Sequence, residues 1–182
     1  MRGALPLAIR GSAAAGLFLL AVIASGDAKA GPVRSLLEIR RENVVMQAWD
    51  ASCGAAALAT VLTHTFADPV AEKSVARDML RRTDPLRVKV RGGFSLLDMK
   101  RYLESRGYTA SGYRGLSVEE LAAMRSPIVV ISEYGDPHFV VVRAIREGRV
   151  LLADPAFGNR SISLERFRAA WQEGIGLVVS RK

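Results

Sequence analysis

Residues 53–63 form an alanine-rich apolar run that reads Cys-Gly-Ala-Ala-Ala-Leu-Ala-Thr-Val-Leu-Thr. Alanine and leucine are strong helix formers, and a helix that is apolar on every side is stable only when it is buried. The run therefore predicts a buried helix from Cys53 to about Phe66. Ser52 precedes it and suits the N-cap of a helix, so Cys53 is expected in the first turn.

Cys53 is the only cysteine of the chain, and its expected position favours ionisation of the thiol. The first turn of a helix carries unpaired N–H groups and a partial positive charge, and both stabilise a thiolate. Such a position lowers the pKa of a cysteine from its usual value of about 8.5. Gly54 adds no side chain beside the sulfur, which predicts room for a substrate backbone. Two interpretations stay open here: a reactive nucleophile, or a small buried apolar residue.

Residues 1–30 are expected to be a signal peptide. Two arginines give a positively charged start, residues 12–24 are apolar, and Ala28-Lys29-Ala30 has the small-x-small form of a cleavage site. The mature domain would then be residues 31–182, in the periplasm or outside the cell. The apolar stretch is shorter than the about 20 residues that span a bilayer. No stable membrane span is therefore expected after signal removal, and an uncleaved signal anchor is the alternative.

The formal net charge of +8 bears on the expected partners. Basic residues are scattered along the chain rather than gathered in blocks, and no nucleic-acid-binding motif is present. We interpret the charge as a solubility feature with a mild preference for acidic peptides, and expect no nucleic-acid partner. One cysteine and two histidines give no structural zinc set, so neither a metal nor another cofactor is expected.

The order of the periodic patterns predicts an α+β fold, with N-terminal helices packed on a mostly antiparallel sheet. A second helix is expected to begin at Asp68-Pro69, and capping boxes that start at Ser95 and Ser117 predict two more. Residues 83–93 are interpreted as a basic loop, a short strand or an exposed flap. From Pro127 the period becomes strand-like. Strands are expected at residues 43–46, 108–114, 128–132, 138–145, 150–153 and 174–180, with a last helix capped by Ser163.

Three further residues are expected to lie near Cys53. His138 starts one strand and Asp154 ends the next, so a hairpin brings both side chains to the same end of the sheet. The carboxylate of Asp154 can hold one imidazole nitrogen and leave the other facing the thiolate. Gln47 comes six residues before the cysteine, where its amide can donate to an oxyanion together with a backbone N–H. The other histidine, His64, is expected to be packed or on the surface.

Five short motifs occur in a specific order along residues 43–180. They are Gln47, Cys53-Gly54-Ala55-Ala56, Gly92-Gly93-Phe94-Ser95, His138-Phe-Val-Val-Val and Asp154-Pro155-Ala156. In this order they resemble the double-glycine leader peptidases, the papain-like cysteine peptidases that process bacteriocin precursors. The resemblance implies a papain-like fold in which Cys53 is the nucleophile and His138 is the base. It also implies that Asp154 orients the base and that Gln47 is the oxyanion-hole donor.

The chain departs from that family at three points. The residue before the cysteine is usually Asp and is Ser52 here, and Ala57 with its neighbours stands where a second cysteine often follows. The chain has no P-loop, whereas the best-known members are fused to an export ATPase. We therefore expect a stand-alone exported peptidase that serves peptide or fibril-subunit secretion, in association with an envelope secretion system.

The resulting hypothesis is an exported cysteine endopeptidase. It would hydrolyse peptide bonds after small residues, such as a Gly-Gly site, in a secreted peptide or protein. A non-catalytic peptide-binding module that acts as a secretion accessory is one alternative, because a fold does not determine a function. A transamidase is another, because it would form the same acyl-enzyme and differ only in the second nucleophile.

Overall fold

A computed structural model describes residues 33–133 and 135–182 of the chain. The expected signal peptide, residues 1–30, lies outside the described residues. Residues 34–182 form a single unit. Within the described ranges, none of the helices combines the length and the apolar character needed to cross a membrane.

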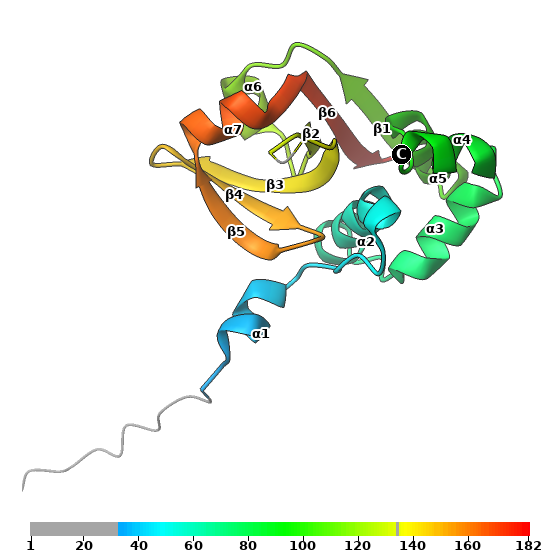
Figure 1. The fold of residues 1–182 in the computed structure, drawn as a ribbon, viewed down its shortest axis with the longest axis horizontal. Helices are drawn as coiled ribbons and strands as arrows, with labels where there is room; N and C mark the ends of the chain where they lie inside the picture. The colour runs from blue at the N-terminus through cyan, green and yellow to red at the C-terminus, as the bar shows by residue number, and fades with distance from the viewer. Residues whose placement is uncertain (1–32, 134) are drawn as a thin grey trace, which may run out of the picture. The chain divides into compact units, whose positions relative to one another are not determined.

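An antiparallel sheet of six strands runs through the domain (Figure 1). The strands are β1 (Tyr108–Tyr113), β2 (Ile128–Ile131), β3 (His138–Arg146), β4 (Arg149–Asp154), β5 (Gly158–Ser163) and β6 (Trp171–Arg181). Their order across the sheet is β1-β6-β2-β3-β4-β5, and every neighbouring pair is antiparallel. The C-terminal strand thus lies between the first and second strands, where it completes the sheet.

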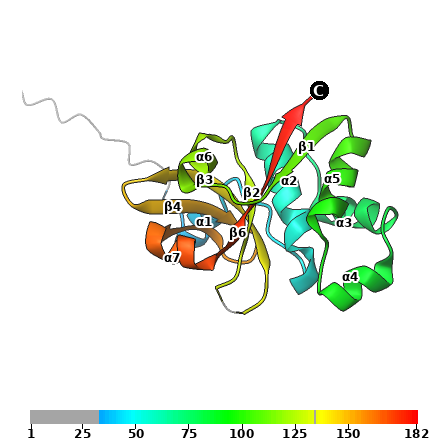
Figure 2. The same ribbon diagram turned by 90° about the horizontal axis from the view of Figure 1, so that it is seen from above.

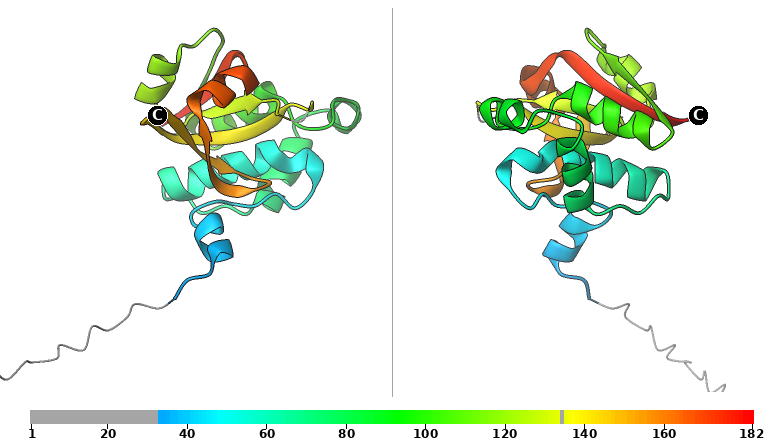
Figure 3. Two further views of the ribbon diagram at one scale, coloured as in Figure 1. Left: turned by 60° about the vertical axis from the view of Figure 1, so that its left-hand side comes forward. Right: turned by 90° about the vertical axis from the view of Figure 1, so that its right-hand side faces the viewer.

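Helices cover both faces of the sheet (Figures 2 and 3). The helices are α1 (Leu36–Arg41), α2 (Cys53–Thr65), α3 (Glu72–Leu80), α4 (Pro85–Arg91), α5 (Leu96–Ser105), α6 (Val118–Ala123) and α7 (Leu164–Ala170), with a short 3₁₀ turn at Asp50–Ser52. Successive residues of a strand point to opposite faces. Ile128 and Val141 accordingly pack against α2, α3 and α5, whereas Val129 and Val140 pack against α6 and α7. The chain is an α+β protein with two apolar cores, one on each face.

The buried alanine-rich helix is confirmed as α2. All residues from Cys53 to Leu62 are buried. Small alanine side chains let α3 on one side and β3 on the other approach α2 closely. The helix therefore packs between the sheet and the other helices on this face. Cys53 therefore lies at the start of a helix that is buried from its first residue to Leu62.

Residues 83–93 do not form the loop, strand or flap that the alternating basic residues suggested. They contain α4, a regular helix. The Asp84 side chain accepts a hydrogen bond from the N–H of Leu86 at 2.9 Å, and Pro85 occupies the first turn. Gly92 ends the helix in the left-handed conformation with φ 77°. These are ordinary start and stop signals, and they outweighed the alternation of valine with arginine and lysine.

The helix expected from Asp68-Pro69 begins later, at Glu72. Asp68 serves a tertiary role instead of a capping role. Its carboxylate accepts hydrogen bonds from Arg106 at 2.7 Å and from the Tyr108 hydroxyl at 3.0 Å. The side chain therefore joins the α2–α3 connection to α5 and β1, and long-range pairing prevails over the local cap.

One strand prediction was wrong, and one strand was missed. Residues 43–46 pair with no strand, because the Val45 N–H donates to the hydroxyl of Thr60 on α2 at 3.0 Å. The edge strand β5 was missed, since it pairs only with β4 and most of its residues are polar, with only Gly158 and Ile162 buried. At this edge Asn159 donates to the carbonyl of Glu42 at 2.7 Å, and the chain before α2 is tied to the sheet.

Gly174 is expected to resist substitution because its backbone and its surroundings both exclude a side chain. Its φ is +61°, and a Cβ would lie 2.6 Å from the backbone nitrogen of Leu116. Gly148 has a similar φ of +68° with nothing within 4 Å, so it isolates the conformational cost. We expect Gly148→Ala to lower the free energy of unfolding by about 1 kcal/mol and Gly174→Ala by about 3 kcal/mol. Urea titration measures both, and equal losses would contradict the packing argument.

Candidate active site

Cys53 is the first residue of α2 and is 8% exposed. Ser52 occupies the N-cap position as predicted, but its side chain does not cap the helix. Its hydroxyl instead donates to the carbonyl of Trp49 at 2.7 Å and accepts from the N–H of Trp49 at 3.3 Å. The serine therefore closes the tight turn before α2, and its side chain caps none of the N–H groups of the first helical turn.

His138 and Asp154 meet as the hairpin argument predicted. His138 opens β3, Asp154 closes β4, and the two strands are antiparallel neighbours. The Nε2 atom of the imidazole lies 2.7 Å from Oδ1 of the carboxylate. With Nε2 engaged, Nδ1 is the nitrogen left for the thiol of Cys53, and a hydrogen bond with His138 is among the causes that lower the pKa of this thiol. Sulfur, imidazole and carboxylate thus form one continuous series.

The thiol and the imidazole shift each other's pKa in opposite directions. Burial opposes the ionisation of Cys53, but the hydrogen bond and the charge of His138 and the N–H groups of Phe139 and Gly54 outweigh it and lower the pKa of the thiol. Burial also opposes the protonation of His138, but Asp154 and the sulfur raise the pKa of the imidazole to about 9. Both shifts favour the thiolate–imidazolium pair at neutral pH.

Asp154 is fully buried, yet its pKa is lowered, which favours the carboxylate at neutral pH. Burial favours its neutral form, whereas His138, the N–H of Ala156 and the charge of Arg160 lower the pKa of the carboxyl. Oδ1 accepts from the N–H of Ala156 at 2.9 Å and of Phe157 at 3.3 Å, and Oδ2 accepts from Arg160 Nε at 2.8 Å. The carboxylate is therefore held in one orientation from several sides.

Gln47 lies beside this series, and its neighbours hold its loop on two sides. Its N–H donates to the carbonyl of Pro155, next to Asp154, at 2.9 Å, and the N–H of Ala48 donates to Glu72 at 3.3 Å. The Oε1 atom of Gln47 is buried with no hydrogen-bond partner in the described part of the chain. The structure brings the backbone of Gln47 to the site, and the residue is not one of those that line the cavity described next.

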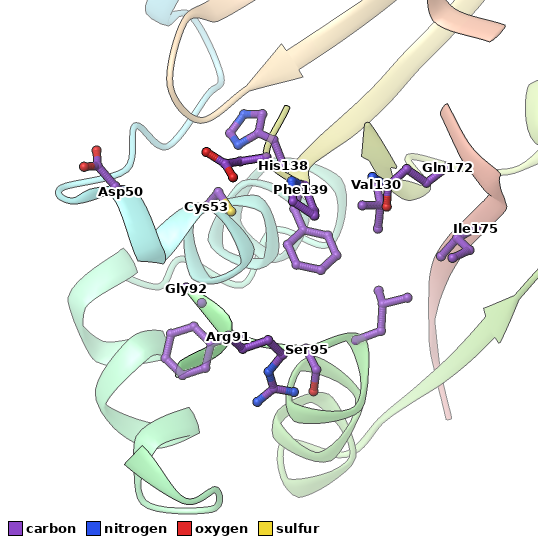
Figure 4. Close-up of a pocket in the computed structure, with 15 residues that line it drawn as sticks. Asp50, Cys53, Arg91, Gly92, Ser95, Val130, His138, Phe139, Gln172 and Ile175 are labelled. Atoms are coloured by element: carbon purple, nitrogen blue, oxygen red, sulfur yellow. The ribbon is translucent and has the colours of Figure 1, made fainter. Parts of the chain in front are cut away.

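A cavity of about 690 Å³ opens beside Cys53 and His138 (Figure 4). The sulfur and the imidazole lie together at one end, Phe139 projects in the middle, and Gln172 and Ile175 of β6 lie at the other end. The lining is mostly apolar and includes Phe94, Leu96, Val130, Phe139 and Ile175. This volume and character suit a segment of a peptide. Sequence reasoning missed the β6 side chains, because no local pattern relates that strand to the cysteine.

Gly54 has a role other than the predicted one, and Gly93 lies close to the chain before α2. A Cβ at Gly54 would lie 3.3 Å from the Phe139 ring and 3.4 Å from the Met99 sulfur. The absence of a side chain at Gly54 therefore serves internal packing rather than substrate access. Gly93, which lines the cavity, has φ +158°, and a Cβ there would meet the Ala51 carbonyl at 3.2 Å. His64 is exposed on α2, in agreement with the prediction that it is a packed or surface residue.

Among residues 33–133 and 135–182, no group of three or more His, Cys, Asp or Glu side chains is arranged to hold a metal ion. The chemistry that the site itself offers is nucleophilic. A buried sulfur with a lowered pKa, next to a histidine held by a carboxylate, is the arrangement that forms covalent acyl intermediates.

The fold and this arrangement together define a papain-like cysteine peptidase. The chain belongs to the peptidase C39 family, whose model matches residues 41–182.

Two curated relatives carry the name probable functional amyloid protease FapD. The protein of Pseudomonas aeruginosa is 39% identical over 150 residues, which are 82% of this chain and 66% of that protein. The protein of Pseudomonas fluorescens is 39% identical over 166 residues, which are 91% of this chain and 73% of that protein. The match thus leaves about a third of the first relative's length uncovered.

A solved structure agrees with the fold. It is the double glycine motif protease from an AMS/PCAT transporter in complex with the leader peptide, at 28% identity and a TM-score of 0.63. The match covers 76% of this chain and 91% of that one. The predicted papain-like fold and the resemblance to double-glycine leader peptidases are thereby confirmed.

Proposed function

We propose that this chain is an exported cysteine endopeptidase that cleaves a secreted peptide or protein after small residues, with Gly-Gly as the preferred site. Cys53 is the nucleophile, His138 the acid and base, Asp154 the residue that orients the histidine, and Gln47 the oxyanion-hole donor. The observation that carries the proposal is the series of sulfur, imidazole and carboxylate, closed by the 2.7 Å contact between His138 and Asp154.

The reaction follows from the atoms of this series. The thiolate of Cys53 attacks the carbonyl carbon of the scissile bond, and the oxyanion accepts from the backbone N–H of Cys53 and the amide of Gln47. The imidazolium of His138 protonates the leaving amine as the C–N bond breaks. The neutral imidazole then removes a proton from water, whose oxygen attacks the thioester. The acid product leaves, and the thiolate–imidazolium pair is restored.

The unpartnered Oε1 of Gln47 supports its role in this scheme. A buried amide oxygen without a partner is costly, so this side chain keeps an unused hydrogen-bonding group close to the residues of the site. Bound substrate places its own N–H and carbonyl groups beside the cysteine. Rotation of the amide by half a turn exchanges the positions of its oxygen and its NH₂ group, and the proposed role requires the NH₂ group to donate to the oxyanion.

The cavity and the relatives support the substrate class. The apolar lining that leads away from Cys53 fits an apolar segment of a chain that has not folded at that point. The relatives in Pseudomonas are named as proteases of functional amyloid. A secreted fibril subunit, or a protein that serves its secretion through the cell envelope, is therefore the proposed substrate.

The proposed location is the periplasm. It rests on the charged start, the apolar stretch of residues 12–24 and the Ala28-Lys29-Ala30 motif, which are typical of a signal peptide. We propose residues 1–30 as the signal peptide and residues 31–182 as the peptidase domain. Export also agrees with a lone cysteine used for catalysis rather than for a disulfide.

Alkylation of Cys53 by iodoacetamide tests the activated thiol without any substrate. Because the pKa of the thiol is lowered, the rate is expected to reach a first plateau well below pH 8.5. A second rise is expected near pH 9, where the imidazolium loses its proton and no longer restrains the sulfur. The measurement is the rate of mass gain between pH 4 and 10. A single step at about pH 8.5 would overturn the proposal.

A further inference from the structure

A second series of charged side chains continues from Asp154, away from Cys53. Arg160 of β5 donates through Nε to Asp154 Oδ2 at 2.8 Å, and its Nη2 pairs with Oε2 of Glu133. Glu133, which follows β2, also accepts through Oε1 from Arg166 Nε of α7 at 2.7 Å. The carboxylate that holds His138 is thus itself held by an arginine, and that arginine is held by a second carboxylate.

These groups are taken out of water. The side chain of Asp154 is 0% exposed, that of Glu133 is 4% exposed and that of Arg160 is 18% exposed. The guanidinium of Arg160 also lies 5.5 Å from the centre of the Phe157 ring, which covers it. Buried ion pairs repay little of their desolvation cost as net stability. A role in the site explains their presence better than a contribution to stability.

The division of contacts between the two oxygens of Asp154 indicates that role. Oδ1 receives His138 and the N–H groups of Ala156 and Phe157, whereas Oδ2 receives Arg160. A carboxylate held at both oxygens cannot rotate about its Cβ–Cγ bond without losing contacts on both sides. Arg160 therefore fixes the plane of the carboxylate, because its guanidinium donates to Asp154 and Glu133 through two nitrogens in a rigid planar geometry that the single nitrogen of an ammonium does not reproduce.

We propose that Arg160 is a positioning residue of the peptidase: it bridges Asp154 and Glu133, orients the carboxylate toward His138, and offsets part of the negative charge behind the imidazole. The inference rests on the proposed function of Cys53, His138 and Asp154. Arg160 does not touch the reacting atoms and acts through Asp154.

The sign of the electrostatic effect follows from the surrounding charges. The titratable and charged groups around His138 and Asp154 come from several elements. They are Asp50 before α2, Cys53 at its start, Arg91 of α4, Glu133 after β2, Asp136 before β3 and Arg160 of β5. Arg166 of α7 lies farther away and pairs with Glu133. Removal of the Arg160 cation makes the potential at the site more negative. Both the imidazolium and the thiol then hold their protons to higher pH.

The test compares Arg160→Met, Arg160→Lys and Glu133→Gln with the matched control Arg149→Met in the full chain. Arg149 lies on the same β4–β5 pair, where it donates to Ser161 at 2.7 Å and is exposed, and it does not contact Asp154. Two readouts are used for each variant: the pH profile of iodoacetamide alkylation of Cys53, and kcat and KM for cleavage of a Gly-Gly peptide. Circular dichroism and urea titration verify folding.

We expect Arg160→Met to raise the midpoint of the first alkylation step by about half to one pH unit. We expect its kcat to fall about 10- to 100-fold with KM changed less than about twofold, because substrate contacts remain. Arg160→Lys keeps the charge, so its midpoint stays near that of the unsubstituted protein while kcat falls about fivefold from the lost bridge. Glu133→Gln, which weakens the outer anchor of Arg160, is expected to lower kcat by a similar factor, and Arg149→Met to change neither readout.

Each outcome separates this proposal from the proposed function. If the unsubstituted protein shows an ordinary thiol, the proposed function fails. If it shows the lowered pKa and folded Arg160→Met keeps the same midpoint and kcat, the positioning role of Arg160 is overturned. If Arg160→Met does not fold, Arg160→Lys and Glu133→Gln decide, and unchanged kcat in both of these folded variants overturns the role.

Discussion

Cys53→Ala is expected to abolish peptide-bond cleavage while the domain stays folded. Removal of a nucleophile that acts together with a base lowers kcat by about 10⁴-fold or more in enzymes of this type. The structural cost is small, because alanine removes one sulfur atom and is itself a strong helix former at the start of α2. The measurement is the appearance of new N-termini in a peptide that contains Gly-Gly, read by mass spectrometry, for both proteins.

Two further variants make the result specific. Cys53→Ser keeps a hydroxyl at the same position, yet a hydroxyl is a far weaker nucleophile, so its activity is expected to stay near that of the alanine variant. His64→Ala changes an exposed histidine on the same helix and is expected to leave kcat unchanged. If Cys53→Ala supports secretion of the proposed substrate as well as the unsubstituted protein does, the chain acts as a peptide-binding module and not as a peptidase.

Asp154→Asn is expected to lower both activity and stability. An amide cannot replace the carboxylate in either orientation. With its oxygen toward His138 and the Ala156 N–H, its NH₂ group meets the donating Arg160 Nε, and the opposite orientation directs NH₂ at the backbone donors. We expect kcat to fall about 10²- to 10⁴-fold, since the histidine loses its orienting anion.

The stability loss has a defined dependence on pH. The pKa of Asp154 is lowered in the fold, so its contribution is present above the pKa of an unfolded aspartate and is lost as the pH falls through the folded value. At pH 7 the loss of the anion leaves the largely buried Arg160 without one of its two carboxylate partners. This is expected to lower the free energy of unfolding by about 3 kcal/mol. Urea titrations of both proteins at pH 7 and pH 3 measure this, and the difference should shrink at the lower pH.

Asp78→Asn is the matched control for these measurements. Asp78 pairs with Arg81 at 3.4 Å on the outer side of α3, as a half-exposed surface pair. Such pairs contribute about 0–1 kcal/mol, so little change is expected in stability or kcat. If Asp154→Asn behaves like this control, the carboxylate has no part in orienting His138.

Local patterns were sufficient for the elements that carry the site. The apolar run after Ser52 predicted α2, and the capping boxes predicted α5 and α6, both of which show the reciprocal hydrogen bonds. The switch to a period of two predicted β3 and β4. Since His138 and Asp154 lie at the joined ends of a hairpin, their contact follows from short-range geometry that a sequence displays.

Long-range pairing explains what the sequence did not reveal. β5 is a mostly polar edge strand, so its composition does not predict that it pairs with β4. Asp68 was interpreted as the start of a helix because its pairing with Arg106 across 38 residues has no local sign. The same reason hid Arg160, whose partners Asp154 and Glu133 lie at the end of β4 and after β2.

The amino-acid sequence by itself determined three features. They are the position of the thiol at the start of a buried helix, the positions of the histidine and the carboxylate at the ends of adjoining strands, and the α+β fold class. These features depend on propensity and periodicity, which act over a few residues. Only the tertiary structure decided that a guanidinium supports the carboxylate, that β6 closes the far end of the cavity, and that the glycine after the cysteine makes room for an aromatic ring. Those contacts join residues that are far apart in the chain. Burial and charge pairing select such partners, and local sequence patterns do not predict them.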